Sequence, residues 1–164
     1  MAAPQVSWRK RDNSAPVDKW TIGTIDAGDT SAVFGVLIWN NFGGTGDLST
    51  MTNCTVTTKD SSGNNTGELV LDKLIEVKVD SDPSSTDFEP IGGDATHPIQ
   101  AGGNTTNASG TTSPNTQEIL GVANDASKNN ARGNYAELSL RARVPGTATA
   151  GNVSFLTRVA YQYV

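Results

Sequence analysis

Hydrophobic residues recur at every second position in several short segments of the chain. In "LIEVKVD", residues 74–80, the apolar side chains of Ile75, Val77 and Val79 alternate with charged ones, and we expect Glu76 to face water. Successive side chains of a β-strand point to opposite faces of a sheet, so this period predicts strands with one buried face. No window of 11 or more residues carries a convincing helical period, so we expect almost no helix.

Similar patterns predict strands along most of the chain. They lie at residues 18–25, 32–40, 51–60, 74–80, 134–144 and 152–164, with shorter strands near Phe88 and at 117–122. Residues 32–40 are apolar on both faces, which favours a strand covered on both sides. About seven to nine short strands separated by turns are typical of an all-β, antiparallel two-sheet sandwich, either immunoglobulin-like or jelly-roll-like.

The first residues read as an extended N-terminal arm, residues 1–19, followed by a single sandwich domain, residues 20–164. Pro4 and Pro16 disfavour helix, and the charges between them offer no core face. Trp8 is the exception. It either folds back on its own domain or inserts into a partner subunit.

A loop-rich insertion is expected around residues 81–116, which hold few apolar anchors. Loops this long are uncommon in a compact domain and are usually functional or flexible. We therefore expect this segment to be exposed, with Phe88, Ile91 and His97 as candidate contact residues.

Charge is unevenly distributed. Residues 1–20 hold four basic and two acidic side chains (4 − 2 = +2), and the remainder holds eight basic and fifteen acidic ones (8 − 15 = −7). An acidic body repels phosphate backbones, so nucleic acid is not expected as the main partner. Arg9, Lys10 and Arg11, with Trp8, are the candidate partner-binding residues of the arm. They would dock on an acidic surface.

Two features favour folding in a reducing cytoplasm. Cys54 is the single cysteine and cannot form an internal disulfide, and the N-terminal residues lack the apolar core of a signal peptide. The longest apolar run is too short for a bilayer-spanning helix, which needs about 20 residues, so no membrane association is expected.

Residues suited to catalysis are scarce. His97 is the only imidazole, no GxSxG motif accompanies it, and zinc would need more Cys and His ligands. The acidic turns at residues 26–29 and 80–87 leave a calcium site open, although neither has EF-hand spacing. Trp20 and Trp39 fall on strand faces, which leaves few aromatics for a sugar platform. We expect no enzymatic activity and no cofactor.

Four segments resemble small structural proteins of tailed bacteriophages. They are "IGTIDAGDTSAVFGVLIWNNFGG", "MTNCTVTTKDSSGNNTGELV", "IEVKVDS" and "FLTRVAYQYV". The proteins they resemble are capsid decoration or tail-associated proteins with immunoglobulin-like folds. The resemblance implies a virion protein made in the bacterial cytoplasm, which forms homo-oligomers and binds the major capsid protein or another virion protein. Capsid decoration is the leading hypothesis. The alternatives are a tail-associated structural protein and a carbohydrate-binding or adhesive module.

Overall fold

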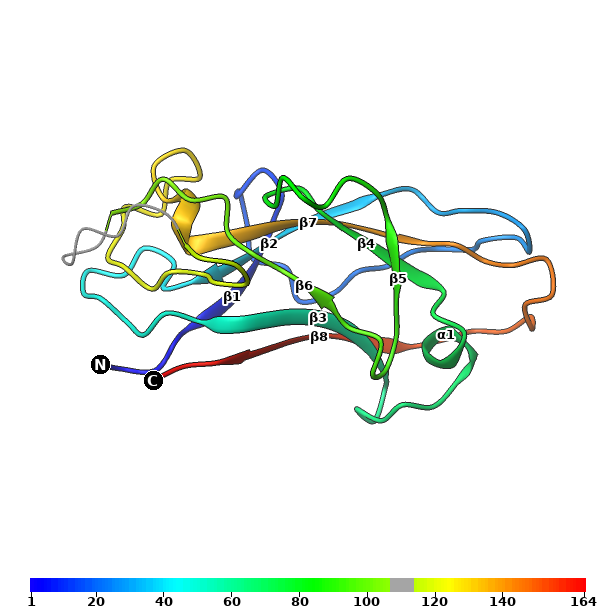
Figure 1. Cartoon of the computed structure of the whole chain (residues 1–164). Helices are drawn as coiled ribbons and strands as arrows, with labels where there is room; N and C mark the ends of the chain where they lie inside the picture. Colours follow the sequence, from blue (N-terminus) through cyan, green and yellow to red (C-terminus); the bar gives the residue numbers. More distant parts are fainter. Residues whose placement is uncertain (107–113) are drawn as a thin grey trace.

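The chain folds into two antiparallel β-sheets packed face to face (Figure 1), seen in a computed structural model that describes residues 1–106 and 114–164. The elements are β1 (Val6–Lys10), β2 (Phe34–Asn40), β3 (Thr52–Asp60), α1 (Glu68–Leu71), β4 (Ile75–Val79), β5 (Glu89–Ile91), β6 (His97–Pro98), a 3₁₀ turn (Arg132–Asn134), β7 (Tyr135–Ala142) and β8 (Phe155–Gln162). The predicted all-β, antiparallel two-sheet sandwich is therefore confirmed.

Five strands form the larger sheet, in the order β1-β2-β7-β4-β5, and three form the smaller one, in the order β6-β3-β8. All the strand pairs are antiparallel. The β3–β8 pair is the longest in the smaller sheet, and its register shifts between Thr52 and Thr55. Asn53, within this irregularity, has a positive φ of 51°.

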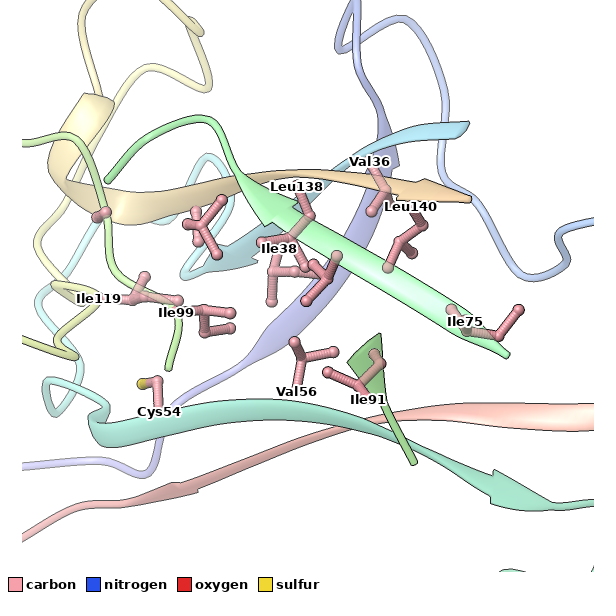
Figure 2. Close-up of a cluster of buried hydrophobic side chains, with 14 of the residues drawn as sticks. Val36, Ile38, Cys54, Val56, Ile75, Ile91, Ile99, Ile119, Leu138 and Leu140 are labelled. Carbon is pink, nitrogen blue, oxygen red and sulfur yellow. The ribbon is translucent and has the colours of Figure 1, made fainter. Parts of the chain in front are cut away.

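The main core lies between the two sheets, where side chains of period two meet (Figure 2). Val36, Ile38, Leu138 and Leu140 point inward from the larger sheet, and Val56 faces them from β3. Each of these side chains is almost fully buried. Such a core holds the two sheets in a fixed position relative to each other, because close-packed side chains leave no free space into which either sheet could shift.

Strand β2 is also covered on its outer face. Leu37 and Trp39 are fully buried there against Ala131 and Tyr135, with Phe42 packed beside them. The ring of Trp39 lies 4.8 Å from that of Tyr135 and 5.0 Å from that of Phe42. The structure thus confirms that the apolar run at residues 32–40 contains a strand buried on both sides.

The expected arm belongs to the sandwich. Residues 6–10 form β1 and pair with β2 over five positions, so residue 19 is not a boundary between arm and domain. Val6 and Trp8 pack against the main core. The physical reason is their spacing of two, which places both side chains on the core-facing side of a strand.

Residues 18–25 form no strand, contrary to the prediction. Trp20 nevertheless joins the core, stacking on Phe34 at a centroid distance of 5.3 Å. Gly23 has a φ of 86°, a left-handed conformation that breaks extended pairing.

Residues 68–71 form the single turn of helix α1.

The insertion at residues 81–116 is more structured than its composition suggests. It contains β5 and β6, and Ile91 and Ile99 are completely buried in the main core. Ile91 is therefore not an exposed contact residue, because it pairs with Ile75 of β4 and faces the core. Residues 107–113 of this expected insertion lie outside the described residues.

At one end of the sandwich, the side-chain amides of buried asparagines form hydrogen bonds to the loops. Asn41 is 3% exposed, and its amide nitrogen lies 2.8 Å from the carbonyl oxygens of Gly46 and Gly121. The amide of Asn134 likewise donates to the carbonyl oxygens of Asn40 and Val122. These bonds satisfy backbone carbonyls that no strand partner reaches, which buried loops require.

Candidate interaction surface

In the described part of the chain, the two sheets have four edge strands, namely β1, β5, β6 and β8. An exposed edge presents unpaired N–H and C=O groups that can bind another strand, and natural proteins usually guard such edges. Three of these four strands have a feature that hinders pairing with another strand, and the fourth, β8, does not.

The edge of β1 is covered by the chain that follows it. The amide of Lys10 donates to the Ala15 carbonyl oxygen at 2.9 Å, and the amide of Val17 donates to the Trp8 carbonyl oxygen at 2.8 Å. The turn between them, residues 11–14, folds the chain back along β1. This cover removes two of the positions at which another strand could pair.

Strands β5 and β6 are guarded by length and by proline. Strand β5 has three residues with Pro90 at its centre, and β6 has two residues, of which Pro98 is the second. Proline has no amide hydrogen to donate, so neither strand can extend a ladder of hydrogen bonds.

Strand β8 carries none of these guards. Its eight residues, "FLTRVAYQ", contain no proline and a single charge, Arg158. It pairs with β3 on one side, and in residues 1–106 and 114–164 no other strand pairs with it. The irregular register lies at Asn53 on the β3 side, so β8 itself stays regular. In Figure 1, β8 runs along the lower side of the molecule.

The side chains of β8 alternate strictly. Phe155, Val159 and Tyr161 point inward and pack against the main core, while Leu156 and Ala160 are exposed on the outer face. The core contacts fix the position of the strand, and the free edge remains accessible. Within β8, Leu156 is 44% exposed. Apolar surface continues past both ends of the strand: the exposed fractions are 62% for Val153 and 51% for Tyr163, and Val164 is fully exposed.

Both chain ends lie at the same end of the sandwich, near the C-terminal end of β8 (Figure 1). Ser49 joins them, because its amide donates to the Ala2 carbonyl oxygen and its hydroxyl donates to the Val164 carbonyl oxygen, each at 2.9 Å. Residues 163–164 are thus held along the same line as β8.

Arg11 is tied to its own domain. Its guanidinium lies 2.8 Å from the Asp80 carboxylate and 3.5 Å from that of Glu137, and it also donates to the Ser139 hydroxyl. The acidic surface that the basic segment was expected to reach is therefore present within the same chain. Lys128 completes the cluster, 3.1 Å from Glu137.

The other residues of the expected arm divide in two. Arg9 is engaged within the domain, with its guanidinium 3.9 Å from the centroid of the Phe42 ring and hydrogen-bonded to Asn13. Lys10 is exposed and lines an open groove with Pro16 and Phe34. A partner-binding role for Lys10 stays a prediction.

The outer face of the larger sheet is more covered than strand alternation predicts. Glu76 was expected to face water but is buried, 2.8 Å from the Arg141 guanidinium and 4.0 Å from that of Arg143. Arg141 also lies 4.0 Å from the centroid of the Phe88 ring. Phe88 is therefore half-buried beneath a cation, because apolar and charged side chains on neighbouring strands cover one another.

His97 has no catalytic partner in the part of the chain that the structure describes. It sits on β6 opposite Val56, and its Nδ1 lies 2.7 Å from the Pro98 carbonyl oxygen. The described residues contain no group of three or more His, Cys, Asp or Glu side chains able to hold a metal ion. Of the acidic turn residues, Asp80 pairs with Arg11, and Asp82 accepts bonds from Ser84.

Hydrogen bonds in exposed turns lower the pKa of three aspartates. The Thr66 hydroxyl and the Asn64 amide stabilise the charged form of Asp60. Ser14 acts in the same way on Asp12, and Asn130 on Asp125. These carboxylates serve as turn caps, because each one accepts bonds from residues two to six positions further along the chain.

Cys54 is expected to be unreactive in the folded protein. Burial, together with the nearby charge of Glu118, raises the pKa of its thiol from 9.0 to about 12. We expect Ellman's reagent at pH 8 to label it far more slowly in the native chain than in denaturant, because only the thiolate reacts. A Gln162→Cys variant supplies an exposed thiol as control, and equal rates for the two thiols would contradict the burial.

The same thiol makes stability depend on pH. Below about pH 9 it is protonated in both states and contributes no dependence. Between about pH 9 and 12 the unfolded chain loses this proton and the folded chain keeps it, so the stability falls as pH rises. The slope from this group is at most about 1.4 kcal/mol per pH unit, measurable by urea titration at each pH.

The described geometry defines an all-β sandwich with one unguarded edge strand. Within the described residues, no helix has the length and apolar character that crossing a membrane requires. No protein-family model matches the chain, and no curated protein matches it.

The sequence predicted a strand at residues 152–164 but not its position at the edge of the smaller sheet. The alternation of side chains does not indicate which strands are neighbours.

Proposed function

We propose that this chain is a non-enzymatic structural protein of a bacteriophage particle. In the form we favour, it is a capsid decoration protein that binds the head surface and reinforces it. The proposal starts from the expectation that four segments of the sequence resemble phage structural proteins, and the open edge of β8 on a rigid core supports it. The edge is the observation that carries it, since natural proteins usually cover or interrupt the free edge of a regular strand, and that of the eight-residue β8 is open in the described structure.

A sandwich with one open edge suits repeated assembly. Addition of a strand to an existing edge gains main-chain hydrogen bonds without refolding either partner, and the neighbouring side chains supply specificity. The inward residues of β8 anchor the edge to the core. A load applied to the edge would pass directly into the two-sheet core, which is the mechanical property a reinforcing protein needs.

The experiment uses purified particles of a phage that encodes this sequence. Quantitative mass spectrometry should find the chain at a fixed ratio to the major capsid protein, and immunogold labelling should place it on the head. Labelling of the tail would overturn decoration in favour of the tail-associated alternative. Complete absence from washed particles would reject the virion proposal.

The carbohydrate-binding alternative gains no support from the aromatic residues. Trp39 is completely buried, and Trp8 and Trp20 pack against the main core. Tyr161 faces the core as well. Replacing the exposed Tyr163 by alanine would test a sugar site directly, by glycan-array binding before and after the change.

A further inference from the structure

The outer face of β8 has a symmetric distribution of side chains about Ala160. Two residues before it lies Arg158, and two residues after it lies Gln162. Four residues before it lies Leu156, which is partly exposed, and four residues after it lies Val164, which is fully exposed. Residues at equal distances on either side thus have matching character, polar with polar and apolar with apolar.

We propose that the edge of β8 binds the same edge of a second copy of this chain. The two strands run antiparallel about a two-fold axis at Ala160 and join the two three-stranded sheets into one of six strands (3 + 3). The inference rests on the proposed function in treating β8 as an assembly surface, and it names the partner at that surface. A two-fold interface uses the same patch on both subunits, so the patch must complement itself.

This register matches the outer-face side chains well. Ala160 lies opposite Ala160 of the second copy, so the two-fold axis passes between small side chains. Arg158 lies opposite Gln162, and Leu156 lies opposite Val164, in both halves of the interface. Residues directly opposite in an antiparallel pair have Cβ atoms about 4.5–5.5 Å apart, which brings each apolar pair into contact.

The same register keeps the two cations apart. Arg158 and its copy are offset by four residues along the strands, roughly 14 Å at about 3.4 Å per residue, which exceeds the Debye length of about 8 Å in physiological salt. Centring the pair on Arg158 would place the two guanidiniums directly opposite. Centring it on Val159 would set Leu156 against Gln162 and leave Val164 without an apolar partner.

The inner face fits the same arrangement. Val159 lies opposite Tyr161, and Thr157 lies opposite Tyr163, which is half exposed in the single chain. Aromatic and β-branched residues form favourable cross-strand pairs. The inner faces of both copies stay on one side of the joined sheet, because side chains directly opposite one another must point to the same face.

The oligomeric state of the purified full chain tests the pairing. Sedimentation equilibrium should show a concentration-dependent dimer, and Ala160→Lys should raise its dissociation constant roughly tenfold or more, because two ammonium groups would meet at the axis. Ala27→Lys is the matched control. It makes the same charge change at an exposed turn next to Val144, away from β8, and should leave the dimer unchanged.

Cross-linking tests the register. Ala160→Cys should form a covalent dimer with a short bismaleimide, whereas Gln162→Cys should not, because its copy lies roughly 14 Å away along the strands. Cys54 is completely buried and does not compete. A wild-type chain that stays monomeric, a dimer insensitive to Ala160→Lys, or equal cross-linking of the two cysteine variants would each overturn the proposal.

These outcomes separate the inference from the proposed function. A chain present in particles but monomeric in isolation, with an unchanged particle content for Ala160→Lys, would reject the two-fold pairing and leave the virion role standing. A dimer of the predicted register in a chain absent from particles would do the reverse. Circular dichroism of each variant confirms that the β-sandwich is intact.

Discussion

Replacing Trp39 by alanine should lower the free energy of unfolding by about 3–5 kcal/mol, because it empties the centre of the cluster on the outer face of β2. The side chain is completely buried, with aromatic contacts to Phe42 and Tyr135. Urea denaturation followed by circular dichroism measures the change. The midpoint should fall with little change in slope.

A matched variant separates packing from hydrogen bonding at this position. The indole Nε1 of Trp39 is buried, with no hydrogen-bond partner in the described residues. Trp39→Phe therefore loses no hydrogen bond and keeps most of the apolar volume, so its cost should be about half that of Trp39→Ala or less. Equal losses for the two variants would show that packing of the ring is not what stabilises the cluster.

Replacing Asn41 by leucine should cost about 1–3 kcal/mol of unfolding free energy. Three carbonyl oxygens lie within hydrogen-bond distance of its amide nitrogen: those of Gly46 and Gly121 at 2.8 Å and that of Val122 at 3.2 Å. Removing the donor takes away the bond to the Gly46 carbonyl, whereas the Gly121 carbonyl still accepts from the Leu48 amide and the Val122 carbonyl from Asn134. A buried acceptor that finds no substitute costs about 1–3 kcal/mol. Thermal and urea unfolding both measure this loss.

Backbone conformation contributes at the same residue. Asn41 has a φ of 62°, which asparagine and glycine tolerate better than leucine does. Asn41→Gly keeps that conformation but removes the side chain with its amide, so a larger loss for leucine than for glycine would reflect the cost of placing a leucine in this conformation and this space. A glycine variant as stable as the wild type would show that the amide bonds contribute nothing.

Neither position touches β8, which receives its support from the main core. Phe155, Val159 and Tyr161 pack against that core, and β8 pairs with β3 from Thr52 to Asp60. At temperatures where the Trp39 and Asn41 variants remain folded, we expect their dimer dissociation constants to equal that of the wild type. This independence follows because distant sites without shared partners have nearly additive effects.

Strands buried on one face were predictable from the sequence because their signal is local. At residues 74–80 and 134–144, apolar side chains at every second position occupy the face that the structure buries. In β3, Cys54, Val56 and Thr58 lie on the predicted inner face. Each of these assignments depends only on the two-residue repeat of an extended backbone.

Features that depend on distant residues could not be predicted in this way. Glu76 is buried because Arg141, some 65 positions later, pairs with it. Ile91 reads as a loop residue because β5 has only three residues, too few to show alternation. From the sequence, Trp8 could either pack on its own domain or insert into a partner subunit. The pairing of β1 with β2 places it in its own domain.

The sequence alone determined that this chain forms an antiparallel sandwich. The alternation of apolar and polar side chains along a strand can be recognised from neighbouring residues. Only the tertiary structure decided which strands became edges, because an edge is defined by the absence of a neighbour, and strand pairing joins residues far apart in the chain. Strand β8 looks like any other strand in the sequence. Its last place in the order β6-β3-β8 leaves one side of an eight-residue strand open in the described structure.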